Sequence, residues 1–297
     1  MRSALREEPA RTALNRVHGM MFKWSLNPYM GCAHRCTFCY VRAFERRADR
    51  PADDRYGEAI RVKVNVAEVL AAELARPSWE REEVVIGAAT DPYQPAEGRY
   101  RLTRACIRLL GFHRTPIGII TRGPLIVRDL DVLVEAARRV PVSVNISVPT
   151  LDERVWRTTE PGTAPPRQRL RALRRLREAG IRAGVAMAPI LPGLSDARES
   201  MAEVVRAARE AGAAFLWTDA VNLRPGTREH FLEHLARDWP EQLGLYERLF
   251  RERAYLPGPE RDAVRHQLST LKREIPPTEP LPLIEPEPQP VQLALAV

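Results

Sequence analysis

The chain has little of what marks several common classes of protein. It holds only four cysteines in 297 residues, and three of them are clustered, so it lacks the disulfide framework of a small secreted protein. It contains no run of eighteen apolar residues, and residues 1–16 are charged and lack the apolar segment of a secretory signal. We therefore expect a cytoplasmic protein with no membrane partner.

The motifs of the commonest enzyme classes are also missing. The sequence has no Gly-rich phosphate loop, no HExxH zinc motif and no nucleophile elbow around a serine. Lysine is rare, since only Lys23, Lys63 and Lys272 among the 46 basic residues are not arginine. The net charge of +8 suits a nucleic acid or another anionic substrate. The arginines are dispersed among acids, however, which is also the pattern of a solvated surface.

Six apolar runs alternate with amphipathic helical stretches along the chain. The runs predict strands near residues 21–26, 83–89, 116–121, 140–148, 181–190 and 213–223. Such alternation predicts an α/β fold with a parallel sheet and right-handed crossovers. Periodicity leaves open whether the sheet is flat or curled. A shorter alternating segment, residues 60–64, predicts a strand at an edge.

The strands and helices of the predicted α/β core cover residues 21–225. The rest of the sequence predicts three further regions. Residues 1–20 have little periodicity and are expected to form a polar N-terminal arm. Residues 226–274 contain amphipathic stretches and predict a C-terminal helical extension. Residues 275–297 hold seven prolines and predict a disordered tail.

The chemistry is predicted to centre on residues 27–40, which follow the first strand. This segment places Cys32, Cys36 and Cys39 in a C-x3-C-x2-C spacing. Three thiolates on one loop can converge on one metal centre, and thiolates select zinc, copper(I) or iron–sulfur. A 4Fe-4S cluster on three cysteines leaves one iron open to a substrate or cofactor. The alternative is a zinc site completed by His34, as in a zinc-stabilised nucleic-acid-binding protein.

This spacing resembles the motif of the radical SAM enzymes. The flanking residues 27–31 and residues 90–95 are similar to those of the spore photoproduct lyase-like branch. The resemblance implies a partial (β/α)6 TIM-like barrel with a C-terminal helical extension. It also implies a 4Fe-4S cluster that binds S-adenosylmethionine (SAM), an external flavodoxin- or ferredoxin-like one-electron reductant, and a lyase or transferase acting on an unknown substrate. Repair of a DNA lesion is the alternative within this branch.

The resemblance further implies site residues beside the cysteines. Phe38 supplies the aromatic residue that the family places before its third cysteine. Tyr40 would relay a hydrogen atom, with simple packing at the start of a helix as the alternative. Thr90 and Asp91 stand where the family holds the methionyl amino group, and they are suitable acceptors for an ammonium. Arg122, after the third strand, would face the carboxylate of SAM.

Later strand ends add further expected contacts. Asn145 and Ser147 lie two apart, so they share one face of a strand, and they would bind the ribose hydroxyls or the carboxylate. Pro189 belongs to the apolar segment 187–190, which resembles the segment that backs the adenine; plain core is the alternative. Asp219 and Asn222 are candidate substrate contacts without a motif.

Three other residues are expected to be structural or exposed. His34 and Arg35 project from the cysteine loop, and Arg35 is expected to be exposed, with tuning of the cluster's charge as the alternative. Cys106 is the one spare thiol, and it falls inside an amphipathic helix. We expect it to be a buried small hydrophobe rather than the hydrogen donor that spore photoproduct lyases use.

Overall fold

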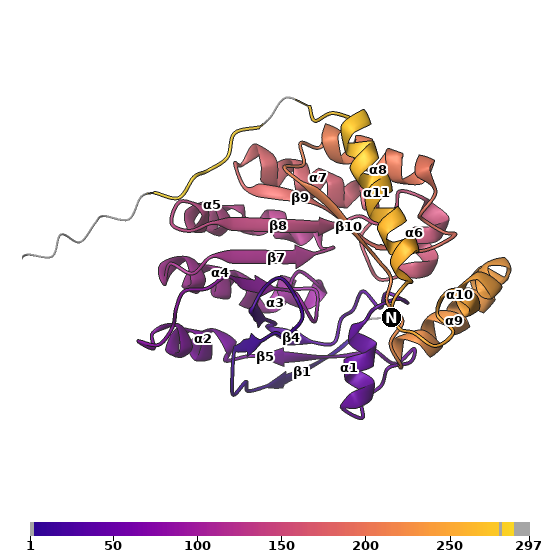
Figure 1. The fold of residues 1–297 in the computed structure, drawn as a ribbon. Coiled ribbons are helices and arrows are strands. Elements are labelled where there is room, and N and C mark those ends of the chain that lie inside the picture. The colour runs from indigo at the N-terminus through magenta and orange to yellow at the C-terminus, as the bar shows by residue number, and fades with distance from the viewer. Residues whose placement is uncertain (1–2, 279–280, 288–297) are drawn as a thin grey trace, which may run out of the picture.

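A mostly parallel sheet forms the centre of the molecule (Figure 1). The structure is a computed structural model, and it describes residues 3–278 and 281–287. The sheet has seven strands in the order β10-β9-β8-β7-β6-β3-β2. Six of them pair in parallel and confirm the alternating pattern. They are β3 (Trp24–Leu26), β6 (Val84–Ile86), β7 (Ile117–Thr121), β8 (Val142–Ser147), β9 (Arg182–Ile190) and β10 (Leu216–Ala220). The linear strand order describes an open sheet, as in a partial barrel.

Helices cover one side of this sheet and line its carboxyl edge (Figure 1). The described helices before β9 are α1 (Val41–Arg47), α2 (Val66–Leu74), α3 (Pro95–Tyr100), α4 (Leu102–Phe112), η1 (Pro124–Asp129), α5 (Leu130–Ala137), α6 (Glu153–Thr159) and α7 (Pro166–Glu178). Those after β9 are α8 (Arg198–Glu210), α9 (Thr227–Asp238), η2 (Pro240–Gln242), α10 (Leu243–Leu249) and α11 (Gly258–Glu274).

The core lies between the sheet and these helices. Ile119, Val144 and Val185, on three adjacent strands, are fully buried. Strands buried on both faces consist of nearly continuous apolar residues, which is why the sequence located them. Within the described residues, no helix combines the length and the apolar character needed to cross a membrane.

The N-terminal segment is more ordered than an arm. It contains β1 (Ala4–Glu8), which pairs with β5 (Ala59–Lys63), and β2 (Leu14–Arg16), which adds antiparallel to β3. The expectation of an edge strand near residues 60–64 was wrong, because β5 lies between β1 and β4 (Tyr29–Met30) in a second sheet. β1 and β2 are short and mostly polar, so their sequences carry no strong apolar alternation.

The proline-rich tail also departs from expectation where it is described. The Ile284 amide donates to the Gly180 carbonyl at 2.9 Å, and the Glu287 amide donates to the Arg138 carbonyl at 2.8 Å. Residues 281–287 therefore follow the ends of α7 and α5 instead of being disordered, because they bond carbonyls that the helices leave free. Residues 279–280 and 288–297, which were also predicted to be disordered, lie outside the described residues.

The N-terminal segment is held by a buried carboxylate on α2. Glu73 accepts hydrogen bonds from the amides of Ala13, at 3.2 Å, and of Leu14, at 2.8 Å. We expect Glu73→Ala to lower the free energy of unfolding by about 1–3 kcal/mol, because buried amides lose their acceptor. Denaturant unfolding measures this, with Glu68→Ala, an exposed glutamate on the same helix, as the control expected to change little. Equal effects of the two substitutions would contradict the anchoring role.

Candidate functional site

The cysteine loop, residues 27–40, starts at the carboxyl end of β3 and leads into α1. Cys32 and Cys36 are buried, and Cys39 is partly exposed. Gly31 begins the turn at φ +82°, and a Cβ at this position would lie 2.9 Å from the Ala59 carbonyl oxygen. Only glycine fits this turn without strain. The three thiols therefore lie where parallel α/β folds place their chemistry, at a strand's carboxyl end.

Residues that follow β6 tie this loop in place. The Thr90 hydroxyl donates to the Gly31 carbonyl at 2.6 Å. Gln94 donates to Thr90 Oγ1 at 2.9 Å and accepts a hydrogen bond from the Ala33 amide at 3.0 Å. Thr90 thus supports the cysteine loop in this structure. Gln94, which is fully buried, was given no role from the sequence, although it lies in the same polar loop.

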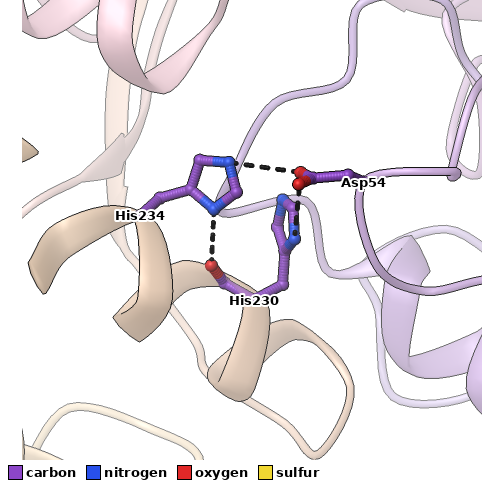
Figure 2. A group of neighbouring side chains, drawn as sticks. All are labelled: Asp54, His230 and His234. Atoms are coloured by element: carbon purple, nitrogen blue, oxygen red, sulfur yellow. Dashed lines mark hydrogen bonds and ion pairs between the residues drawn. The ribbon is translucent and has the colours of Figure 1, made fainter. Parts of the chain in front are cut away.

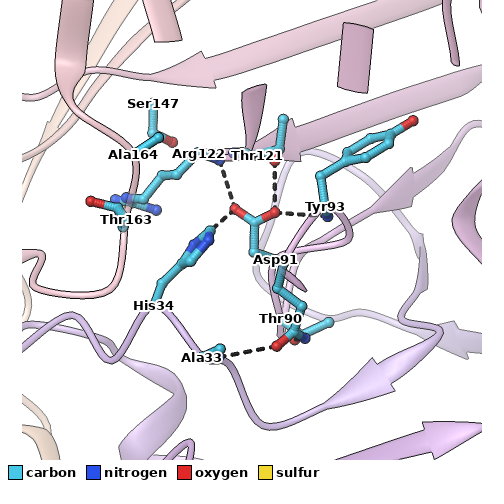
Figure 3. A network of polar contacts seen from close by, with 12 residues as sticks. Ala33, His34, Thr90, Asp91, Tyr93, Thr121, Arg122, Ser147, Thr163 and Ala164 are labelled. Atoms are coloured by element: carbon cyan, nitrogen blue, oxygen red, sulfur yellow. Dashed lines mark hydrogen bonds and ion pairs between the residues drawn. The ribbon is translucent and has the colours of Figure 1, made fainter. Parts of the chain in front are cut away.

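Asp91 is the centre of a buried polar network (Figure 3). Its carboxylate accepts hydrogen bonds from the Tyr93 amide at 2.8 Å, the Thr121 hydroxyl at 2.7 Å and the Arg122 amide at 2.6 Å. His34 Nδ1 lies 3.3 Å from Asp91 Oδ2. His34 is buried, with an exposed fraction of 5%, and Arg35 is partly exposed.

The pKa values of this pair follow from their contact. Burial alone would raise the pKa of Asp91, but the charge and hydrogen bond of His34 dominate, and the amide of Arg122 adds to them, lowering the pKa to about 2. Burial alone would lower the pKa of His34, but Asp91 and the neighbouring Cys32 raise it to about 10. The two side chains therefore form a buried ion pair between the cysteine loop and the end of β6.

A second buried ion-pair group contains Arg122, Glu160 and Arg169. Arg122 Nε donates to Glu160 Oε1 at 2.5 Å, and Arg169 Nη1 lies 2.9 Å from Glu160 Oε2. Burial alone would raise the pKa of Glu160, but Arg169 and Arg122 hold it below its usual value. Arg122 also donates to the Ala188 carbonyl at 3.1 Å, so one side chain connects the ends of β7 and β9. No local pattern in the sequence indicated Glu160, which precedes a Pro-Gly turn.

The surroundings of the thiols fit a bound anionic cluster. Burial raises the pKa of Cys36 well above its usual value and raises that of Cys39, whereas Arg122 lowers both. Uncompensated burial would oppose thiolates, so this nearby cation favours the deprotonated form that a metal needs. Arg122 also lies 5.6 Å from the Phe38 ring centroid.

The arrangement is less suited to a closed zinc site. Four ligands on one tetrahedral zinc, with Zn–S near 2.3 Å, place sulfurs about 3.8 Å apart. Within the described part of the chain, the sulfurs of Cys32, Cys36 and Cys39 do not all lie within 4.8 Å of one another.

The remaining predicted residues near the loop are engaged in packing. The Tyr40 hydroxyl donates to the Ala88 carbonyl, and its ring meets Phe44 edge-on at 5.9 Å. Phe38 is buried in an apolar cluster together with residues of α9 and α10. Pro189 is half-buried near the end of β9. These contacts place all three around the loop, and their predicted roles toward SAM stay predictions.

Asn145 and Ser147 lie at the carboxyl end of β8. Asn145 Oδ1 accepts a hydrogen bond from Trp217 Nε1 at 2.7 Å, which the sequence did not indicate. The Trp217 ring is 40% exposed, so this face of the sheet is accessible beside Asn145. Ser147 is buried, and its carbonyl accepts a hydrogen bond from Arg169 at 3.0 Å. The two residues therefore lie at neighbouring positions of the same strand end, as predicted.

Three further candidates make contacts of their own within the fold. Cys106 is fully buried within α4, in the main apolar core, as expected. Asp219 forms an exposed ion pair with Arg265 of α11 at 3.3 Å. Asn222 forms an isolated backbone bridge with Tyr255.

The buried triad gives a stability prediction. We expect Glu160→Gln to lower the free energy of unfolding by about 3 kcal/mol, because Arg122 and Arg169 lose the charge that compensates their burial. Thermal or denaturant unfolding measures this change. Glu178→Gln, which breaks the exposed pair with Arg174, is the matched control and should cost about 0.5 kcal/mol or less. A Glu160 variant as stable as the control would show that the triad contributes no stability.

Comparisons with known proteins agree on one family. A family model described as the Radical SAM superfamily matches residues 26–205, which include the cysteine loop and the parallel strands β6, β7, β8 and β9. An uncharacterized protein of Mycobacterium tuberculosis is 39% identical over 264 residues, which are 88% of this chain and 78% of that protein. An uncharacterized protein of Methanocaldococcus jannaschii is 24% identical over 74% of this chain and 77% of that protein.

Solved structures show the same fold. Spore photoproduct lyase complexed with dinucleoside spore photoproduct superposes with a TM-score of 0.69 at 16% sequence identity, covering 91% of this chain and 79% of that chain. A mutant of that lyase with bound AdoMet gives the same TM-score and coverage. Identity this low shows the fold alone. The family match over more than half of the chain goes further, and it shows that this protein belongs to the Radical SAM superfamily and is an enzyme of that superfamily.

Proposed function

We propose that this enzyme holds a 4Fe-4S cluster on Cys32, Cys36 and Cys39 and binds SAM beside it, at the carboxyl ends of the parallel strands. The observation that carries the proposal is the position of the three thiols. They lie on one loop at the end of the first parallel strand, mostly buried and next to the cation of Arg122. Three thiolates around a four-iron cluster leave one iron free for SAM.

The cluster and SAM, when bound, supply reductive cleavage of SAM to methionine and a 5′-deoxyadenosyl radical, which abstracts hydrogen from the substrate. The chain's own residues would provide the environment of the cluster. Arg122 offsets the negative charge of the thiolates, and Phe38, packed with residues of α9 and α10, limits access of water. Thr90 and Gln94 fix the loop through Gly31 and thereby the positions of the thiols.

The polar groups at the strand ends are proposed to hold SAM. Asp91 and Thr90 would accept hydrogen bonds from its ammonium, and Asp91 is ionised because its pKa is lowered to about 2. Since Asp91 already bonds His34, an incoming ammonium would share or replace that contact. Asn145 and Ser147 are proposed for the ribose hydroxyls or the carboxylate, and Pro189 for the adenine.

The proposed chemistry also needs a partner. Reductive cleavage of SAM consumes one electron, so we propose an external flavodoxin- or ferredoxin-like one-electron donor. A reducible cluster fits a reducing compartment, and we propose the cytoplasm on that ground. The substrate is proposed to be anionic, since the net charge is +8.

One pair of variants tests the cluster site. We expect Cys36→Ala to lose most of the about four irons that a reconstituted chain binds and to lose SAM cleavage, because a cluster ligand is removed. Cys106→Ala should keep both, since Cys106 lies in the core of α4. Anaerobic reconstitution, iron analysis and chromatography of 5′-deoxyadenosine measure this. Full iron content and cleavage in Cys36→Ala would refute the proposal.

Repair of a DNA lesion is the second candidate, and the fold of spore photoproduct lyase is the observation that favours it. Repair of that kind needs a hydrogen donor beside the substrate. Cys106, the one spare thiol, is fully buried in the core, and burial raises the pKa of its thiol. Lesion repair would therefore require another hydrogen donor. The hydroxyl of Tyr40, the last residue of the cysteine loop, is the candidate for this role.

Incubation of the reduced, SAM-loaded enzyme with dinucleoside spore photoproduct tests this candidate. We expect 5′-deoxyadenosine to form with little or no repaired dinucleoside, because Cys106, the one thiol outside the cysteine loop, is fully buried. Chromatography of the dinucleoside measures the yield. Stoichiometric repair that is lost in Tyr40→Phe would establish lesion repair and give Tyr40 the donor role.

A further inference from the structure

Two histidines and an aspartate meet between α9 and the loop that follows α1 (Figure 2). His230 and His234 lie one helical turn apart on α9, so they share a face. Asp54 approaches them from residues 51–56. Asp54 Oδ1 lies 3.3 Å from His234 Nε2 and 3.8 Å from His230 Nδ1. A ligand atom from each residue lies within 4.8 Å of the other two.

The hydrogen-bond pattern of His234 leaves a gap for a cation. Its Nδ1 lies 2.9 Å from the His230 carbonyl oxygen, which can only accept, so Nδ1 carries the hydrogen. In the neutral ring Nε2 then holds a lone pair, and it faces the carboxylate of Asp54 at 3.3 Å. Two acceptors at this separation repel each other unless a positive group lies between them. A second hydrogen on the ring or a metal ion would satisfy both.

The distances between the ligand atoms fit a metal site. Ligand atoms 2.0–2.2 Å from one tetrahedral ion lie about 3.4 Å apart, close to the two measured distances. Histidine that binds a metal usually donates its other ring hydrogen to a carbonyl or carboxylate, as His234 does to the His230 carbonyl. His230 is 5% exposed, so its ring is held in place by the packing around α9.

A cavity next to this group of two histidines and an aspartate leaves room for further ligands. It has a volume of about 450 Å³, and His230 is part of its wall. Charged residues of both signs also line it: the acidic residues are Asp49, Asp53, Glu229 and Glu233, and the basic residues are Arg46, Arg50 and Arg55. Three protein ligands leave at least one coordination position open, which water or a small anion could fill from this cavity.

We propose that Asp54, His230 and His234 bind a divalent transition-metal ion, Zn²⁺ or Fe²⁺, at a site separate from the cysteine loop. Two imidazoles and one carboxylate are a ligand set that suits these ions. Asp54 is 76% exposed, so an ion can enter from solvent without disturbing the core.

The proposed ion would stabilise the position of the cysteine loop indirectly, through residues that contact the loop. Arg42, on α1, donates to the Cys36 carbonyl at 3.4 Å and to the Ala52 and Asp53 carbonyls at 2.8 and 2.7 Å. Thr227 at the start of α9 donates to the Cys39 carbonyl at 3.1 Å. A metal joining Asp54 to α9 therefore closes a ring of contacts that begins and ends at the cysteines.

The test uses the full chain with its iron loaded, dialysed against ZnCl₂ without oxygen. We expect one zinc per chain beyond the iron, with zinc affinity falling on the order of a hundredfold or more in Asp54→Ala and in His234→Ala. Asp54→Ala is the safer variant, because the side chain is exposed. His266→Ala, which removes an exposed histidine of α11, is the matched control and should bind zinc as the parent does.

Zinc K-edge absorption distinguishes this site from the cysteines. We expect nitrogen and oxygen neighbours at about 2.0–2.2 Å and no sulfur near 2.3 Å. Unchanged zinc affinity in both variants, or a sulfur shell in the parent, would overturn the proposal. Because iron content is read separately, loss of the cluster in the cysteine variants does not bear on this result.

Discussion

The buried carboxylate of Asp91 is the interaction on which the carboxyl edge of the sheet depends. It sits at the end of β6 and bonds groups from three places: His34 on the cysteine loop, Thr121 at the end of β7, and the backbone of its own loop. A buried charge is stable only when fully paired. Each partner must therefore hold its position, and the first three strand ends are fixed relative to one another.

The triad of Arg122, Glu160 and Arg169 extends this constraint across the rest of the edge. Arg122 joins the two networks, since its amide bonds Asp91 while its side chain bonds Glu160. Arg169 then reaches the carbonyl of Ser147, and Arg122 reaches that of Ala188. One connected set of charges thus spans β6 to β9. It keeps the cation of Arg122 close to the thiols.

The sequence predicted what depends on local pattern. The parallel strands were found because burial on both faces makes them continuous apolar runs, and the cysteines because their spacing is specific. Long-range pairing was missed. The burial of His34 was not predicted, because its partner, Asp91, is distant in sequence. Glu160 lies in a Pro-Gly connection without periodicity, and β2 depends on Glu73 of α2. Nothing local to these residues encodes the partner that determines their position.

The same limit explains why the C-terminal helices carried no recognisable motif and yet form a wall of the site. Phe231 of α9 packs in one apolar cluster with Phe38 and Cys36, and Thr227 bonds the Cys39 carbonyl. A loop that holds three thiols in fixed positions cannot be rigid through its own short turns alone. The loop is held by two helices that are far apart in the sequence: α1, through the contacts of Arg42, and α9, through its apolar face. Substitutions on α9 therefore act on the cysteine loop through packing, without touching a thiol.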